Sequence, residues 1–271
     1  MSSFSQLRQK LLDNHGGLGA LRTIHMDFEV AAHAAVRHVF PELLIKGCMF
    51  HFSQSLNQKL NNLGLRNLWV NEGPAGEWIS CCKALAFLPP PLVVPTYNAI
   101  LRNIPQTDDP VRAAKLEEFR IYFQNTWIQG HQFPLAVWNH WSNEGPRTTN
   151  HAEGYHNRLN LEVREGHLAI CNFLHLLQPL HNSDQIRIRH LMANIYQPKA
   201  RDQTYQDLDE RISTSKIRFY EATNHVWDFP NFDAGRMPPF AFQFLMGEIH
   251  AYLRFMRHCV GKKSRIVVHD E

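Results

Sequence analysis

The sequence predicts a helix-rich α/β protein with a small parallel sheet of about two strands. Within residues 1–65, stretches with helical periodicity alternate with short β-tolerant stretches, a pattern typical of strands joined by helical crossovers. From residue 66 to residue 145 no alternation of apolar and polar residues of any length appears. We therefore expect a short α/β layer followed by a larger helical region.

The first 65 residues are predicted to contain three helices and two strands. Apolar residues between Phe4 and Leu12 recur at helical spacing, and the turn-forming stretch DNHGG follows them. Pro41 stops the second helix, and Gly64 occupies the C-terminal cap position of the third. In chain order, the expected elements are a helix at 4–12, a strand at 21–26, a helix at 27–40, a strand at 43–50 and a helix at 53–63.

The remainder of the chain is predicted to be helical between proline-rich breaks. Helical spacing is evident in VRAAKLEEFRIYFQNTW, which begins at Val111. The stretch at 222–239, ATNHVWDFPNFDAGRMPP, is the best linker candidate. Further helices are expected at 150–163, 166–178, 183–195, 203–221 and 239–258.

The composition is that of an intracellular globular protein. Apolar residues make up 44% of the chain and charged residues 20%, and the net charge is +3. This balance permits an anionic partner without requiring one, so any DNA contact has to come from local basic patches. Five cysteines, two of them the adjacent Cys81 and Cys82, form no regular disulfide framework and fit a reducing compartment.

No segment has the character of a signal peptide or a membrane span. The N-terminal stretch lacks an apolar core, and the most apolar stretch, ALAFLPPPLVVP, is short and broken by prolines. The basic stretch at 261–265 fits either a nuclear-localisation signal or a solvated tail, so a nuclear or cytoplasmic location is expected.

Glu153 is an isolated acid in the stretch EGPRTTNHAEGYHNRLN, residues 144–160. At about 100° per residue, the predicted helix packs by one face and presents a narrow polar stripe with a single acid. The stripe consists of Glu153, His156, Asn157, Asn160 and Arg164. Glu153 is then either a metal ligand beside a nucleic-acid backbone or the capping-box partner of Asn150 at a helix start.

Three arginines, Arg147, Arg158 and Arg164, flank this acid. They are candidates for phosphate contacts, and solvated side chains beside a helix cap are the alternative.

Two further sites lie at the ends of the predicted strands. Asp27 stands where the first strand ends, a position where ligands and metals gather in α/β layers, although it would also serve as a helix N-cap. Cys48 and His51 form a C-x2-H pair at the end of the second strand. If the chain turns into a helix near His51, both side chains could reach one Zn²⁺, which needs two more ligands; a buried Cys with a helix-entry His is the alternative.

Taken together, these motifs resemble the Mutator-like element (MULE) transposases. The resemblance rests on MDFEVAAHAAVRHVFPELLIKGCMFHFSQSLNQKLNNLGL, then FLPP, then FPLAVWNHWSNEGPRTTNHAEGYHNRLN, and it covers about residues 4–180 in order and spacing. Asp27 matches the second acid in the family's D-F-E motif. Glu153 matches the third acid in R-T-N-N-x-x-E-G-x-H, where this chain has Thr149 in place of the first Asn. Cys48 and His51 match the C-x2-H pair.

The resemblance implies a ribonuclease-H-like core with a DDE triad that holds two Mg²⁺ ions for DNA strand cleavage and transfer. It divides the chain into a partial core at 1–65, a helical insertion at 66–145, a return to the core with the Glu-bearing helix at 146–180, and a helical extension at 181–271. The expected partners are DNA and a second copy of the chain. Asp27 and Glu153 are expected to approach each other, and His156 is a candidate third ligand for Zn²⁺.

One departure from the family concerns the first Asp, which lies on a strand upstream of the helix that matches residues 4–12. Asp13, the only Asp before Asp27, lies in a predicted turn and is not assigned this role. We therefore expect a truncated transposase that is catalytically inactive by itself. The alternatives are a domesticated non-catalytic DNA- or protein-binding module and a purely structural helical protein.

Overall fold

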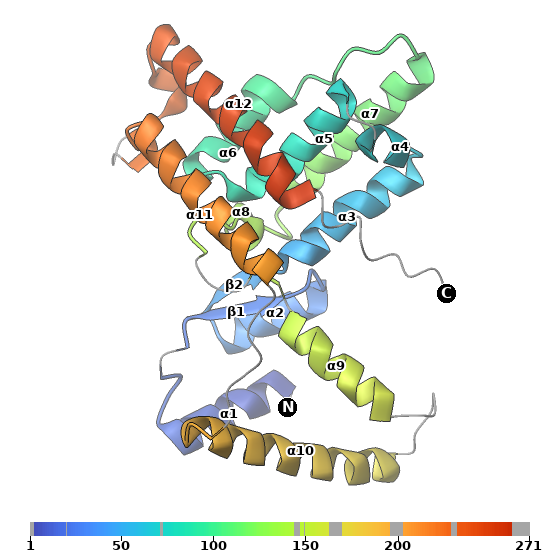
Figure 1. Cartoon of the computed structure of the whole chain (residues 1–271), viewed down its shortest axis with the longest axis vertical. Coiled ribbons are helices and arrows are strands. Elements are labelled where there is room, and N and C mark those ends of the chain that lie inside the picture. Colours follow the sequence, from blue (N-terminus) through green and yellow to red (C-terminus); the bar gives the residue numbers. More distant parts are fainter. Residues whose placement is uncertain are drawn as a thin grey trace. The chain divides into compact units, whose positions relative to one another are not determined.

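In the computed structural model the chain divides into two compact units. Their helices and strands are labelled in Figure 1. The first unit comprises residues 1–148 together with 210–271, and the second comprises residues 149–209. The structure describes residues 3–19, 21–70, 73–143, 147–148, 150–162, 170–195, 203–228 and 232–261.

Two parallel strands in the first unit form a sheet, as the sequence predicts. Strand β1 (Thr23–Met26) pairs with β2 (Leu44–Gly47) in register from Thr23 opposite Leu44 to Met26 opposite Gly47. Helix α2 (Val30–Val39) makes the crossover that a parallel pair needs. Strand β2 is shorter than predicted because Cys48 already caps the next helix.

One face of this sheet is covered by α2 and by α1 (Ser3–His15). Ile24, Met26 and Ile45 point into an apolar cluster that these helices complete. The other members of the cluster are Phe4, Leu11, Leu18, Val36, Val39, Phe40 and Leu43. The strand residues that alternate with these isoleucines therefore belong to the opposite face.

That opposite face meets helix α8 (Leu135–Trp138) through a buried lysine. Lys46 Nζ donates to the carbonyl oxygens of Ala136 at 3.0 Å and Asn139 at 2.8 Å. Burial lowers the pKa of Lys46, and these two carbonyls compensate in part for the water that the ammonium group has lost.

The part of the chain between the strands and residue 143 is helical, as predicted. Proline occupies the first turn of three of these helices, where its missing N–H costs nothing. Gly64, at φ +67°, ends the first of them in the left-handed conformation. The helices are α3 (Met49–Asn62), α4 (Arg66–Val70), α5 (Pro74–Ala84), α6 (Pro90–Thr96), α7 (Pro110–Phe123) and α8.

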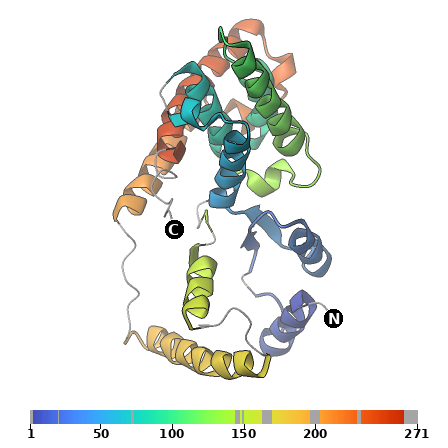
Figure 2. The same ribbon diagram turned by 90° about the vertical axis from the view of Figure 1, so that its right-hand side faces the viewer.

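Two long helices, α11 (Gln203–Ala222) and α12 (Pro239–Gly261), follow the predicted ranges closely. Both views place α12 against α5, where Arg254 Nε lies 2.6 Å from Glu77 Oε1 (Figures 1 and 2). The prediction of a linker at 222–239 is wrong for its described part. Trp227 is buried there and stacks on Phe219, with 5.2 Å between the ring centroids. Packing these large rings together removes apolar surface from water, which stabilises the folded segment.

The second unit contains helices α9 (Asn150–Glu162) and α10 (Ile170–Met192). Two separate helices were predicted at 166–178 and 183–195, and this prediction is wrong because α10 continues through Pro179. No helix in the described part of the chain is long and apolar enough to cross a membrane.

Candidate functional site at the carboxyl ends of the strands

Three segments that are far apart in the sequence meet at the carboxyl ends of β1 and β2. The amide of Cys48 donates to the carbonyl oxygen of Met26 at 2.8 Å, which joins the ends of the two strands. The next amide, that of Met49, donates to the carbonyl oxygen of Arg147 at 2.8 Å. The backbone at Arg147 therefore lies next to the ends of the two strands.

Asp27 follows β1 directly and is exposed. Its Oδ1 accepts from the amide of Glu29 at 3.3 Å, which is a local turn contact. Helix α2 begins at Val30 with Glu29 as its N-cap, so Asp27 is not the N-cap. The observed helix begins three residues later than the predicted start at residue 27. The carboxylate is available for a ligand.

Phe28 holds this loop against the neighbouring strand. A Cβ atom on Gly47 would lie 2.4 Å from Cζ of Phe28, a distance that only glycine permits. On its other side the Phe28 ring meets Trp127 and Phe133 edge-on, at centroid distances of 5.1 Å and 5.0 Å. The helical region at 66–145 therefore contributes directly to the position of Asp27.

His33 fixes the backbone of the same loop. This side chain is buried, and its Nε2 lies 2.6 Å from the carbonyl oxygen of Asp27. Because a carbonyl oxygen can only accept, Nε2 carries the proton. Burial lowers the pKa of His33, which favours this neutral tautomer.

Cys48 and His51 both lie at the start of α3, where Cys48 is the buried N-cap and His51 is in the first turn. The helix begins earlier than predicted, so the pair is not divided between two faces of a strand. Within the described residues no group of three or more His, Cys, Asp and Glu side chains is placed to hold a metal ion. The side chain of His156, the predicted third ligand, lies outside the described part, so the zinc site stays a prediction.

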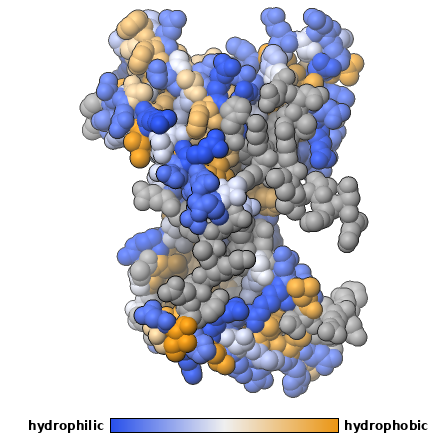
Figure 3. All heavy atoms as spheres, viewed as in Figure 1, coloured by the Kyte–Doolittle hydropathy of each residue, from blue (hydrophilic) through white to orange (hydrophobic). Residues whose placement is uncertain are grey.

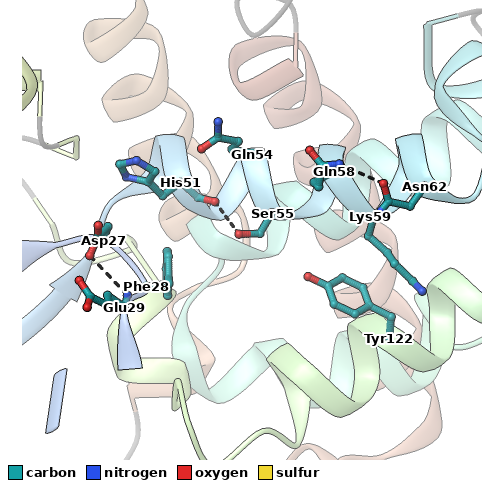
Figure 4. A pocket seen from close by; sticks show the side chains of 10 residues that line it. All are labelled: Asp27, Phe28, Glu29, His51, Gln54, Ser55, Gln58, Lys59, Asn62 and Tyr122. Atoms are coloured by element: carbon teal, nitrogen blue, oxygen red, sulfur yellow. Dashed lines mark hydrogen bonds between the residues drawn. The ribbon is translucent and has the colours of Figure 1, made fainter. Parts of the chain in front are cut away.

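An open groove of about 710 Å³ extends from Asp27 along one side of α3 to Tyr122 of α7 (Figure 4). The residues that α3 contributes recur at spacings of three and four, which places them on one face of the helix. They are His51, Gln54, Ser55, Gln58, Lys59 and Asn62, and Asp27, Phe28, Glu29 and Tyr122 complete the lining. Three of these residues, Gln54, Gln58 and Asn62, carry side-chain amides.

Charge is distributed unevenly in this groove. Asp27 and Glu29 place two carboxylates at one end. Lys59 lies at the other end, where its Nζ is 2.7 Å from Oε1 of Glu118 and 5.7 Å from the Tyr122 ring centroid. The end near Asp27 therefore attracts a cation rather than a bare phosphate.

Two of the three predicted DNA-binding arginines, Arg147 and Arg158, have different surroundings. Arg147 lies beside the start of α3, with its guanidinium carbon 6.0 Å from the ring centroid of Phe87. Arg158 is held within the second unit, because its Nη1 lies 2.7 Å from Oδ1 of Asp184. Arg164 lies outside the described residues. A phosphate contact by Arg158 would have to compete with this ion pair.

Glu153 lies on α9 in the second unit, and its side chain is outside the described part. Its pairing with Asp27 and the capping-box alternative with Asn150 therefore both stay predictions. Asp13 lies within α1 rather than in the predicted turn, and its Oδ1 accepts from Gln9 Nε2 at 2.8 Å. It is on no strand, as expected.

Several residues at this site were not found from the sequence. The contacts that matter here are made between elements, by Phe28, Gly47 and His33. The sequence around each of these residues therefore does not predict its role. The polar face of α3 did have a signal, because His51, Ser55 and Gln58 have helical spacing. No family model, curated protein or solved structure matches this chain.

Proposed function

We propose that this chain is a MULE-type DDE transposase fragment in which β1, α2 and β2 are part of a ribonuclease-H-like core. The observation that supports this most is the convergence at the strand ends. Met26 accepts from the amide of Cys48, and Arg147 accepts from the amide of Met49. Residues of the D-F-E and C-x2-H motifs and Arg147 thus lie close together at the strand ends, where ligands gather in parallel α/β layers.

In this proposal Asp27 and Glu153 are carboxylate ligands of Mg²⁺. The metal ions, when bound, activate the attacking oxygen and stabilise the leaving oxygen of a phosphodiester. Asp27 fits this role because its carboxylate is exposed at the acidic end of an open groove. Phe28 and His33 hold its backbone on both sides, and such support is what an exact ligand position requires.

The proposal further holds that residues 1–271 do not cut DNA by themselves. Two of the family's three acids have matching positions here, and Asp13, which lies on a helix, cannot supply the third from a strand. A domesticated, non-catalytic DNA- or protein-binding module is the second candidate. Arg147 could contact phosphate at the strand ends without any metal.

A plasmid-nicking assay with Mg²⁺ or Mn²⁺ tests the catalytic part of the proposal. We expect the natural chain and the variants Glu153→Gln and Asp27→Asn to nick plasmid at the same background rate. Nicking by the natural chain that both substitutions abolish would disprove the inactivity. Duplex binding that weakens steeply with salt, in the absence of nicking, would favour the binding module.

A cross-linking experiment tests the pairing of the two acids. Asp27→Cys and Glu153→Cys are combined in a Cys171→Ser background, because Cys171 is the exposed cysteine among those described. A bis-maleimide with a spacer of about 10 Å should link them, since ligands of shared metal ions lie close together. The pair Asp27→Cys with Leu191→Cys measures non-specific linking. Equal yields from the two pairs would refute the site.

Zinc is tested separately on the purified chain. If Cys48, His51 and His156 share an ion, metal analysis should find stoichiometric zinc, and a chelator should lower the melting temperature. Protein without zinc, and with a melting curve that a chelator leaves unchanged, would assign Cys48 to packing alone.

A further inference from the structure

Helix α12 exposes a continuous apolar stripe on the side away from the core. Phe240 is 83% exposed, Phe244 55% and Phe255 42%. Gly247 and Ala251 are exposed between them. At about 100° per residue these five residues fall within about 80° of the helix circumference, so they form one stripe roughly 22 Å long. We call Phe240, Phe244, Gly247, Ala251 and Phe255 the α12 stripe.

The stripe is not needed to hold α12 in the first unit. The opposite side of the helix is buried through Leu245, Ile249, Leu253 and Met256. Pale orange, apolar side chains lie along the course of α12 on the face shown in Figure 3. The free energy falls when an exposed aromatic row with no charged member is covered by another surface.

We propose that the α12 stripe is the interface between two copies of this chain, related by a two-fold axis with their α12 helices antiparallel. A two-fold axis between positions 247 and 248 places Phe240 opposite Phe255 of the second copy. It also places Phe244 opposite Ala251 of the second copy. Every large side chain then meets either a ring or a hollow, which is the self-complementarity that a two-fold interface requires.

The small residues at the centre of the stripe determine this arrangement. A Cβ added to Gly247 would meet no heavy atom within 4 Å, so the position is open in the single chain. Gly247 and Ala251 let two helix axes approach closely there, because the interaxial distance depends on the side chains at the contact. A parallel pair would instead set Phe244 against Phe244 of the second copy, and the facing rings would hold the helix axes apart.

The area available predicts a weak dimer. The exposed parts of the three phenylalanines amount to on the order of 350 Å² per copy, taking about 200 Å² for each full side chain. The pair would bury about 700 Å² from these rings, which is below the about 1,200 Å² at the lower end of specific interfaces. We therefore expect a dissociation constant in the micromolar range.

Analytical ultracentrifugation of the full chain between about 1 and 200 µM tests the proposal. The natural chain should pass from monomer to dimer, and Phe244→Glu should stay monomeric throughout. Val111→Glu, an equally drastic change at an apolar residue of α7 that is 63% exposed, should dimerise like the natural chain. A natural chain that is monomeric at 200 µM, or a Phe244→Glu variant that still dimerises, would overturn the proposal.

Gly247→Gln separates association from folding. Glutamine favours helix more than glycine, so the melting temperature measured at low concentration should rise. The dissociation constant should nevertheless increase at least tenfold, because a long side chain prevents close approach of the helices. An unchanged dissociation constant would remove Gly247 from the interface and contradict the proposal.

Disulfide cross-linking determines the direction of the pair. In a Cys171→Ser background, a mixture of Phe240→Cys and Phe255→Cys chains should form a mixed disulfide several times faster than Phe240→Cys alone links to itself. Faster linking of Phe240→Cys to itself would indicate parallel helices and refute the antiparallel dimer.

Discussion

Phe28 connects the position of an exposed acid to a glycine on the neighbouring strand. Its ring occupies the space that a side chain on Gly47 would fill, and Trp127 and Phe133 enclose it from the helical region. Asp27 is therefore placed by the residue that follows it. The middle residue of the D-F-E stretch has a packing role that its neighbours in sequence do not reveal.

Gly47→Ala should destabilise the protein by about 1–3 kcal/mol, because the added methyl group overlaps the Phe28 ring and the packed aromatic cluster cannot yield freely. Urea unfolding measures the change. Gly17→Ala is the matched control, since no heavy atom lies within 4 Å of its added Cβ. In a Phe28→Ala background the cost of Gly47→Ala should shrink, and an undiminished cost would show that the clash lies elsewhere.

His140 is a fully buried imidazole among positive charges. Burial is the largest cause that lowers its pKa, to about 3, and nearby Lys46, His25, Arg147 and Lys216 lower it further. The ring is therefore neutral at physiological pH. Its Nδ1 lies 3.1 Å from Nδ2 of Asn143.

This imidazole makes stability fall as the pH falls below about 6.5. Between pH 6.5 and about 3 the unfolded chain binds a proton at His140 that the folded chain does not. The free energy of unfolding is thus largest above pH 6.5 and decreases toward acid by at most about 1.4 kcal/mol per pH unit from this residue. In urea unfolding from pH 7 to pH 5, His140→Gln should give a shallower slope. The exposed control His131→Gln should keep the natural slope, and an identical slope in both variants would contradict the prediction.

Helix α7 begins with a side-chain cap that the sequence makes recognisable. Asp109 Oδ1 accepts from the amides of Val111 at 2.9 Å and Arg112 at 3.1 Å, and Pro110 fills the first helical position. These contacts satisfy two of the amides that a helix start leaves without intrahelical partners. The aromatic side chains of α7 can then be held in the core from a defined first turn.

Asp109→Ala should lower the free energy of unfolding by about 1 kcal/mol, because both amides lose their acceptor. Thermal or urea unfolding measures the loss. Asp108→Ala, at the exposed neighbouring position, should change stability by less than about 0.5 kcal/mol. Equal effects at the two positions would assign the loss to charge rather than to capping.

The two compact units differ in how much apolar surface they bury. The first unit contains a large core that includes Phe52, Trp138 and Leu253. Among the described side chains of the second unit, Leu180 is the one buried apolar residue. Regions with few buried apolar contacts open at lower free energy than the core.

Amide hydrogen exchange should therefore be faster in α9 and α10 of the second unit than in α3, α5 and α12 of the first. Mass spectrometry of peptides from the native chain measures this difference. Protection of α10 equal to that of α5 would mean that the second unit gains stability from contacts beyond its own side chains.

The sequence by itself determined most of the helices and the parallel strand pair. The helix expected at 203–221 is found at Gln203–Ala222, and Gly64 ends α3 as its position indicated. Such features depend on spacing and on single residues, so a local stretch is sufficient to predict them. The predicted break between two helices near Pro179 is wrong, because α10 continues through this proline. A proline removes one backbone hydrogen-bond donor, but the residues beyond it can remain helical.

The tertiary structure alone decided which segments meet. The sequence marked Asp27 and Cys48 as residues at strand ends, but not the contact of Phe28 with Gly47 or of Met49 with Arg147. These contacts join residues that are remote in the chain. They stabilise the protein only after the intervening loops have closed, which costs chain entropy. Periodicity within a stretch therefore predicts the elements, whereas the geometry of a site depends on packing between them.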